Sequence, residues 1–577
     1  MPSLQDWVYN VEAGPARLWL VRVSLLLLVV GLSAFISLRE FNGLRTFEAM
    51  DLAQQARQLA EGKGFTTLCI RPLALWQIRA NSGTEPPPVS AFPETLTPPL
   101  LPATLAGLFK VGMLSKILPF DLSPEAIRGF RIYPPDIVFL GLQLVLVVAS
   151  TFLIYAWAHQ QFDIGTGLLA AVFFFGSSPI WTKTVEGGST ILAVFFYALA
   201  GRLFSLGAIR QEEDESSGFF WFFSAGLFLG GTMLVQVLHF WVALAAGGLA
   251  CLVLRRGRLA FILGLVVGFV FFFVWLVRMY LITKNPVGLN WAFFLADSPH
   301  FPGEMIWRTY SFDINKTDVW RRLGGALLRG FADLLSQGPG LVGSSVAGTL
   351  ALVGFLHVFR RPSAKAGKNL WSGVAAVLIL VTAFVQRSGE EDGHPILMVL
   401  LPAVCVYGAA YLWILIERWK LHLELLGKLF SMGVALAATG PLLTRIILPE
   451  PPPFAYPPTY PPIFLLMRSW FEPGELQASD LPAAEAWYAE QPTLWLPSTR
   501  EDFLKIHDRV APVFSILLTP KSSDARMYSQ MLAENSEWKD WADLIRRQKP
   551  PDLPQAFATS LPPNNDYLLL SIQKRWN

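Results

Sequence analysis

Charged residues and cysteines are scarce in this sequence. Only 15% of the 577 residues are charged and 53% are hydrophobic, whereas an ordinary soluble domain carries about 25% charged residues. So little polar surface cannot coat a globule of this size in water, and the natural solvent for the excess apolar surface is lipid. The three cysteines, Cys69, Cys251 and Cys405, lie far apart, so no zinc, haem or disulfide motif is supported. The net charge of +3 gives no reason to expect a nucleic-acid partner.

Long apolar runs occupy most of the first 448 residues. A transmembrane helix needs about 20 mostly apolar residues, and about eleven segments meet this requirement. They lie near 18–38, 136–158, 165–182, 189–209, 219–237, 239–254, 259–282, 341–359, 371–387, 394–416 and 427–448. The sequence therefore predicts an all-α polytopic membrane protein whose transmembrane domain covers residues 1–448.

The basic loops predict which side of the membrane each end of the chain occupies. Lys and Arg gather in short cytoplasmic loops, and the clusters within 255–258, 360–368 and 418–428 are all cytoplasmic if residues 97–118 do not span. The acidic loop 388–393 then lies outside. We therefore expect 97–118, which opens with a proline pair and carries two lysines, to be a membrane-surface or re-entrant segment. The N-terminus is then inside and the C-terminus outside.

Three regions are expected on the outer face, at 39–135, at 283–340 and after 448. Residues 449–477 read as a stiff Pro-rich linker with a surface segment, and residues 478–577 as a small α/β domain. The strands of this domain are expected at 492–497, 512–520 and 567–575, and its helices at 499–510 and 525–547. It has no recognisable catalytic set, so we expect it to hold an acceptor or a protein partner.

The first outer region contains a helix signal in residues 47–65. Apolar residues recur at the spacing of one helix face, and Gly62 and Gly64 supply the stop. We expect this helix to lie along the membrane surface. Glu48 and Asp51 stand three apart in its first turn, on one face, where carboxylates also suit the positive end of the helix dipole. Capping alone is therefore one explanation for both carboxylates.

Several motifs of the chain are shared with one family. They are Ala56-Arg57, Leu59, Gly62, Gly64, the segment Pro98-Pro99-Leu100-Leu101-Pro102, the SPIW turn at 178–181 and the late run at 394–410. Together they resemble bacterial membrane glycosyltransferases of the GT-C fold, the protein mannosyltransferase and aminoarabinose transferase group of glycosyltransferase family 39. The resemblance implies a multi-pass enzyme of the bacterial cytoplasmic (inner) membrane. Such enzymes move a sugar from a polyprenyl-phosphate carrier to an acceptor at the outer face.

The resemblance also implies a catalytic acid in the first outer loop. Counting back from Ala56-Arg57, Glu48 stands where the family usually has Asp, and Asp51 is the nearest alternative. Sugar transfer needs a carboxylate to take the acceptor proton and positive charge, from side chains or a divalent metal ion, to stabilise the departing phosphate. The cations proposed for the phosphate are Arg57, Lys63, Arg71, Lys183 and His394. Metal ligands are not identified.

Two other functions stay open at this point. A non-catalytic scaffold subunit of a membrane complex is consistent with Glu48 in place of Asp and with Thr97 in place of the usual Lys or His before the proline pair. A transporter of the lipid carrier is a further alternative, but such proteins tend to show repeated halves and interrupted spans, and the sequence pattern shows neither. The partners expected for the enzyme are a polyprenyl-phosphate sugar and membrane lipid.

Overall fold

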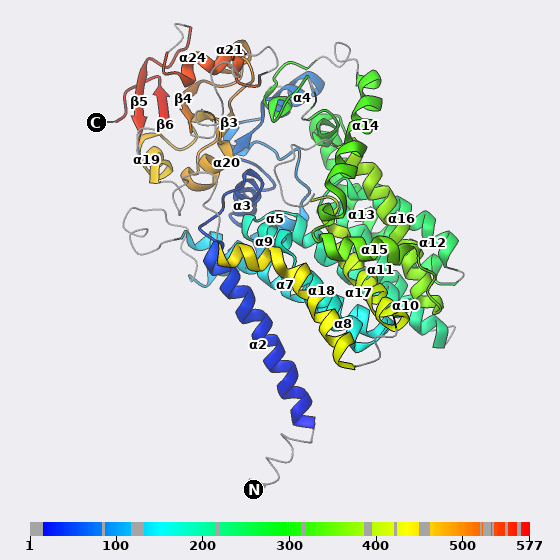
Figure 1. Ribbon diagram of the computed structural model, residues 1–577. Coiled ribbons are helices and arrows are strands. Elements are labelled where there is room, and N and C mark those ends of the chain that lie inside the picture. The colour runs from blue at the N-terminus through cyan, green and yellow to red at the C-terminus, as the bar shows by residue number, and fades with distance from the viewer. Residues whose placement is uncertain are drawn as a thin grey trace.

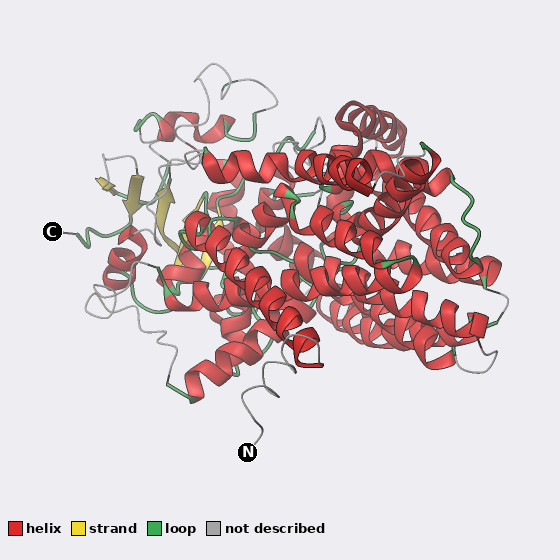
Figure 2. Ribbon diagram, turned by 60° about the horizontal axis from the view of Figure 1, so that its bottom comes forward, coloured by secondary structure: helices red, strands yellow, loops and turns green. Residues whose placement is uncertain are grey.

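The structure is a computed structural model, and it has two layers (Figure 1). It describes residues 15–82, 87–116, 132–213, 218–254, 256–296, 298, 300–312, 319–385, 395–419, 424–448, 462–519, 522, 532, 536–548, 552–561 and 567–576. One layer is a bundle of apolar helices. The other, which we call the loop layer, contains the described residues of 41–116, 285–312 and 462–576 and includes all the strands. Figure 2 shows these strands confined to one end of an otherwise helical molecule.

Seven helices among the described residues are long and apolar enough to cross a membrane. They are α2 (Pro15–Glu40), α7 (Pro134–Gln161), α10 (Thr190–Glu213), α13 (Arg258–Thr283), α16 (Pro362–Phe384), α17 (Leu401–Arg418) and α18 (Glu424–Ile447). Two bent pairs raise the number to nine if each pair is one span. These are α8 (Ile164–Phe175) with α9 (Ser178–Glu186), bent by 50°, and residues 330–342 with α15 (Ser345–Leu356), bent by 104°.

The predicted count of eleven spans is not confirmed, although each predicted segment contains a helix. The two remaining segments correspond to α11 (Phe219–Gly231) and α12 (His239–Val253), which have 13 and 15 residues. A helix rises about 1.5 Å per residue, so neither reaches across an apolar core of about 30 Å by itself. The segment expected not to span contains α5 (Leu100–Leu114), whose 15 residues are too few for the same reason.

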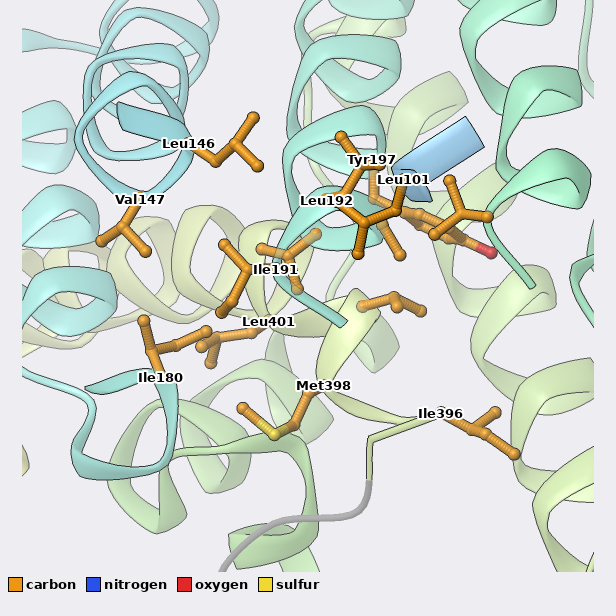
Figure 3. Close-up of a cluster of buried hydrophobic side chains, with 14 of the residues drawn as sticks. Leu101, Leu146, Val147, Ile180, Ile191, Leu192, Tyr197, Ile396, Met398 and Leu401 are labelled. Carbon is orange, nitrogen blue, oxygen red and sulfur yellow. The ribbon is translucent and has the colours of Figure 1, made fainter. Parts of the chain in front are cut away.

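The bundle core fixes the place of α9 and of the first turns of α10. Figure 3 shows buried apolar side chains converging from α5, α7, α9, α10 and α17. Leu101, Val147, Ile180, Ile191 and Leu401 are each at most 1% exposed. Because these side chains pack on one another, the short loop between α9 and α10 is held beside the loop layer.

The loop layer is built on a six-stranded sheet with strand order β1-β3-β2-β4-β6-β5. Its strands are β1 (Cys69–Ile70), β2 (Leu476–Ser479), β3 (Thr493–Trp495), β4 (Val513–Leu518), β5 (Phe557–Leu561) and β6 (Tyr567–Ser571). The first four in this order are parallel, and β6 pairs antiparallel with both of its neighbours, β4 and β5. Because β1 comes from the first loop and pairs with β3, the sheet is not built from the C-terminal region alone.

Several elements of the C-terminal region lie where the sequence predicted them. β3, β4, β6 and α21 (Arg500–Arg509) fall inside their expected ranges. β1, β2 and β5 were not predicted, and β2 begins ahead of the expected boundary at 478. The helix expected over 525–547 is represented by the short η9 (Lys539–Trp541) and α24 (Ala542–Ile545), and much of the range lies outside the described residues. The domain boundaries stay a prediction.

Helix α3 (Phe47–Ala60) confirms the helix predicted in the first loop but not its exposed position. The hydroxyl of Thr46 accepts from the Ala49 amide and caps the helix. Only Phe47, Glu48 and Leu59 escape burial, because α5 packs on one side and α20 (Pro482–Ala484) with η8 (Glu485–Ala489) on another. The expectation of a helix lying on the membrane surface was therefore wrong, since the C-terminal region covers it.

Two buried polar side chains fasten η8 to the rest of the molecule. Asp136, in the first turn of α7, accepts hydrogen bonds from Trp487 Nε1 at 2.9 Å, Tyr488 OH at 2.9 Å and the Leu44 amide at 3.2 Å. On the other side, Arg57 of α3 donates to the Trp487 and Ala486 carbonyls at 2.9 and 2.8 Å.

We predict that Arg57→Leu destabilises the protein strongly. The Arg57 side chain is 1% exposed, pairs with Glu490 at 3.0 Å and lies over the Trp487 ring. Its loss leaves buried carbonyls without a donor, and removing one member of a buried charged contact costs about 3–5 kcal/mol. The apparent Tm should fall, whereas Lys63→Ala, which removes an exposed ion pair, should change stability by less than about 0.5 kcal/mol. Equal melting curves for the two variants would contradict this assignment.

Candidate functional site

Glu48 is the predicted catalytic acid, and its side chain is exposed at the start of α3. Its Oε1 accepts hydrogen bonds from the Ser189 amide at 3.0 Å and the Ser189 hydroxyl at 2.7 Å. Ser189 directly precedes α10, and a Cβ added at the neighbouring Gly188 would lie 3.4 Å from the Glu48 carboxylate. Glu48 is therefore oriented by the α9–α10 loop while it remains open to a reactant.

Lys183, a predicted phosphate-binding residue, lies on α9 near the same loop. Its Nζ is 3.0 Å from Glu186 Oε2, and its side chain is 9% exposed. The hydroxyl of Thr46 donates to the Glu186 carbonyl at 3.1 Å, which connects α9 to the residues just before α3. Lys183 thus begins the short segment 183–189, and Ser189 at the other end of this segment donates to Glu48.

The ends of the first and last long helices add further charges here. Arg445 of α18 pairs with Glu40 of α2 at 2.7 Å between Nη2 and Oε2, and it also donates to the Thr182 hydroxyl. Arg45 donates to the Glu40 carbonyl at 3.1 Å. We call the whole set the rim cluster. Its members are Glu40, Arg45, Glu48, Thr182, Lys183, Glu186, Ser189 and Arg445.

Electrostatic interactions connect Arg45 to other charged members of the rim cluster, Glu40, Glu186 and Arg445. Burial lowers the pKa of Arg45, attraction to Glu40 and Glu186 opposes this effect, and repulsion from Arg445 adds to it. Arg45 is therefore close enough to feel all three groups. With three basic and three acidic side chains, the cluster is formally neutral.

Asp51 and Arg71 belong to a second, buried set of charges. Arg71 Nη2 is 2.5 Å from Asp51 Oδ2, and Nη1 is 3.8 Å from Glu94 Oε1. The three side chains are at most 5% exposed. Gln54 donates to Asp51, and Gln55 donates to Glu94, each at 2.9 Å. We call these five residues the buried ion-pair cluster.

The charges of this cluster stabilise one another and the loop around them. Burial alone would lower the pKa of Arg71, but attraction to Asp51 and Glu94 outweighs it and raises that pKa. Burial raises the pKa of Glu94 against the attraction of Arg71. Glu94 Oε1 also accepts from the backbone amides of residues 95–97 at 2.7–3.0 Å. The cluster therefore holds the first loop against α3.

Arg57 and Lys63, two further predicted phosphate-binding residues, are engaged by partners other than Glu48. Arg57 is occupied by η8, as described above. Lys63, on the turn after α3, pairs with Glu61 at 2.6 Å and is 57% exposed. His394 lies outside the described residues.

The sequence reasoning missed Glu40, Arg45 and Arg445 as members of the site. A Glu and an Arg at the outer ends of the first and last predicted spans were a usable signal, because charges at such positions stay near the water boundary. Within the part of the chain that the structure describes, no group of three or more His, Cys, Asp or Glu side chains is arranged to hold a metal ion.

Comparisons with known proteins give a fold relationship. No protein-family model and no curated protein matches the sequence. ArnT from Cupriavidus metallidurans bound to undecaprenyl phosphate is 13% identical with a TM-score of 0.51, and the match covers 96% of this chain and 98% of that chain. The Archaeoglobus fulgidus oligosaccharyltransferase tethered with an acceptor peptide is 11% identical with a TM-score of 0.56, covering 90% and 71%.

A third solved structure agrees with these two. Archaeal AglB from Archaeoglobus fulgidus, in complex with an inhibitory peptide and a dolichol-phosphate, is 12% identical with a TM-score of 0.50, and the match covers 90% of this chain and 72% of that chain. Structural matches at such low sequence identity establish the fold only. Together with the apolar helices, they confirm that this chain is a membrane protein with the GT-C fold.

Proposed function

We propose that this protein is a glycosyltransferase that moves a sugar from a polyprenyl-phosphate carrier to an acceptor at the outer face of the cytoplasmic membrane. The observation that carries this proposal is the exposed Glu48 carboxylate, oriented by Ser189 on the same short segment as Lys183. Two solved proteins of this fold hold undecaprenyl phosphate and dolichol-phosphate, which supports a lipid-phosphate carrier here.

Glu48 acts as the general base in this proposal. The acceptor hydroxyl attacks the anomeric carbon of the sugar, a new carbon–oxygen bond forms, and the bond from that carbon to the carrier phosphate breaks. Glu48 takes the proton of the hydroxyl, and polyprenyl phosphate leaves with the bonding electrons. Ser189 contributes by fixing the carboxylate, since a general base must lie within hydrogen-bond reach of the proton that it takes.

Positive charge on the rim cluster stabilises the leaving phosphate in this proposal. We assign this role to Lys183 because it lies on α9 next to Thr182 and its ion pair opens toward solvent. Its partner Glu186 is 31% exposed, whereas both members of the pair of Arg71 with Asp51 are 5% exposed. Asp51, Arg57 and Arg71 use their charges inside the protein, so we assign them to structure instead of chemistry. Lys63 is paired on an exposed turn, and His394 and a metal ion stay untested predictions.

The C-terminal region borders the same site. The ring of Phe47, the residue before Glu48, stacks on Trp495 of β3 with centroids 4.5 Å apart. We propose that residues 478–577 present the acceptor or a partner protein to Glu48 and do no chemistry themselves.

The expected result for Glu48→Gln is a loss of about 10²–10⁴-fold in the rate of sugar transfer, the usual contribution of a general base, with an unchanged apparent Tm. Glu48→Asp should retain part of the activity. Asp51→Asn is the matched variant, and it should lower the Tm because it breaks the pair with buried Arg71. The assay is transfer from a polyprenyl-phosphate sugar by the purified protein.

Two results would overturn this assignment. Near-wild-type turnover of Glu48→Gln would mean that another group takes the proton. A stable but inactive Asp51→Asn would exchange the roles of the two carboxylates. If the wild type transfers no sugar from any carrier, the scaffold function becomes the better interpretation.

A reporter fusion tests the proposed orientation. Alkaline phosphatase is active only outside the cytoplasm, so we expect an active enzyme when it follows Asn577 and an inactive one when it is inserted after Arg256, within a basic loop. The reverse pattern would place Glu48 and the loop layer on the cytoplasmic face and contradict an outer-face reaction.

A further inference from the structure

Helices α2 and α18 are embedded far less than the other candidate spans. Within the apolar 18-residue stretch of each helix, only 17% is buried in α2 and 11% in α18, against at least 39% in each of the other five long helices. In Figure 1 the two helices meet beside α9 and diverge toward the opposite end of the bundle. Apolar side chains along both are exposed, including Leu32, Phe35 and Leu38 on α2 and Leu436, Leu443 and Ile447 on α18.

Their meeting point is polar. Arg445 joins Glu40 and Thr182 there, and Arg45 donates to the Glu40 carbonyl. The Glu40 side chain is 12% exposed, whereas that of Arg445 is 29% exposed. A guanidinium has more N–H donors than these two partners use, so Arg445 retains an accessible side on which another anion can bind.

We propose that Arg445 binds the phosphate of the polyprenyl carrier, and that the polyprenyl chain lies along the exposed apolar side chains of α2 and α18. This inference rests on the proposed function and assigns the place of its donor. An apolar chain matches the exposed faces of the two helices, and a phosphate matches the planar fork of Arg445, which can bind it with two parallel hydrogen bonds.

Glu40 has a defined part in this arrangement. It competes with the phosphate for Arg445, so the empty site keeps its charge paired. When Arg445 turns to the phosphate, Arg45 stays close enough to attract Glu40. The Glu186 carbonyl bonds to Thr46, and Ser189 holds Glu48. A phosphate on Arg445 therefore lies on the same rim cluster as the proposed base. Arg445 contacts Thr182 and Glu48 contacts Ser189, and Lys183 lies between these two contact residues in the sequence.

Opposite effects of two variants test this proposal. The full chain in nanodiscs is titrated with undecaprenyl phosphate, with undecaprenol, with phosphatidylglycerol and with inorganic phosphate. Arg445→Gln should weaken binding of undecaprenyl phosphate by about 10–100-fold, the usual effect of losing hydrogen bonds to a charged group, and leave undecaprenol unaffected. Glu40→Gln removes the competitor and should tighten binding of undecaprenyl phosphate. Arg468→Gln is the matched control, because Arg468 is also a half-exposed partner of a carboxylate at 3.0 Å.

A merely structural ion pair gives a different result. If Glu40 and Arg445 only hold α2 to α18, both variants weaken binding together with the Tm, and the proposal is overturned. Unchanged affinity in a folded Arg445→Gln also overturns it while the proposed function stands. Equal competition by phosphatidylglycerol would show a general anionic-lipid site in place of a carrier site. A wild type that binds no polyprenyl phosphate would remove the proposed function as well.

Discussion

Asp136 connects three parts of the chain through one buried carboxylate. It stands in the first turn of α7 and accepts from Trp487, Tyr488 and the Leu44 amide. An uncompensated carboxylate inside a protein is costly, so these donors are needed wherever Asp136 is buried. The contact therefore fixes the start of the first loop and the C-terminal η8 on the end of a bundle helix. Glu48 follows Leu44 closely in the chain, and its position depends on this arrangement.

The few charges of the sequence are divided between two tasks. Those of the buried ion-pair cluster, together with Arg57 and Asp136, contact groups within the same chain and hold the loop layer together. Those of the rim cluster are more accessible and sit near the ends of α2, α9 and α18. The separation corrects the expectation that Glu48 and Asp51 share one face of α3, because Glu48 is exposed in the first turn and Asp51, three residues later, is buried against Arg71.

Local signals in the sequence predicted much of the fold. Long apolar runs predicted the bundle helices, and the helical spacing that ends at Gly62 and Gly64 predicted α3. Short apolar runs in the C-terminal region predicted β3, β4 and β6. The roles of Arg57 and Arg71 depended on contacts distant in sequence, with η8 and Glu94, which no local pattern contains. The rim cluster was missed for the same reason, since Glu40 and Arg445 are about 400 residues apart.

The proposed position of the carrier phosphate beside the rim cluster is tested most directly by an experimental structure of the protein in a lipid bilayer with bound undecaprenyl phosphate. We expect phosphate density within hydrogen-bond distance of rim-cluster cations, on the side of the α9–α10 loop where Glu48 is held by Ser189. Density for the polyprenyl chain should run along the exposed apolar side chains of α2 and α18. A phosphate bound elsewhere, with Glu48 facing away from it into bulk solvent, would contradict both the site and the proposed reaction.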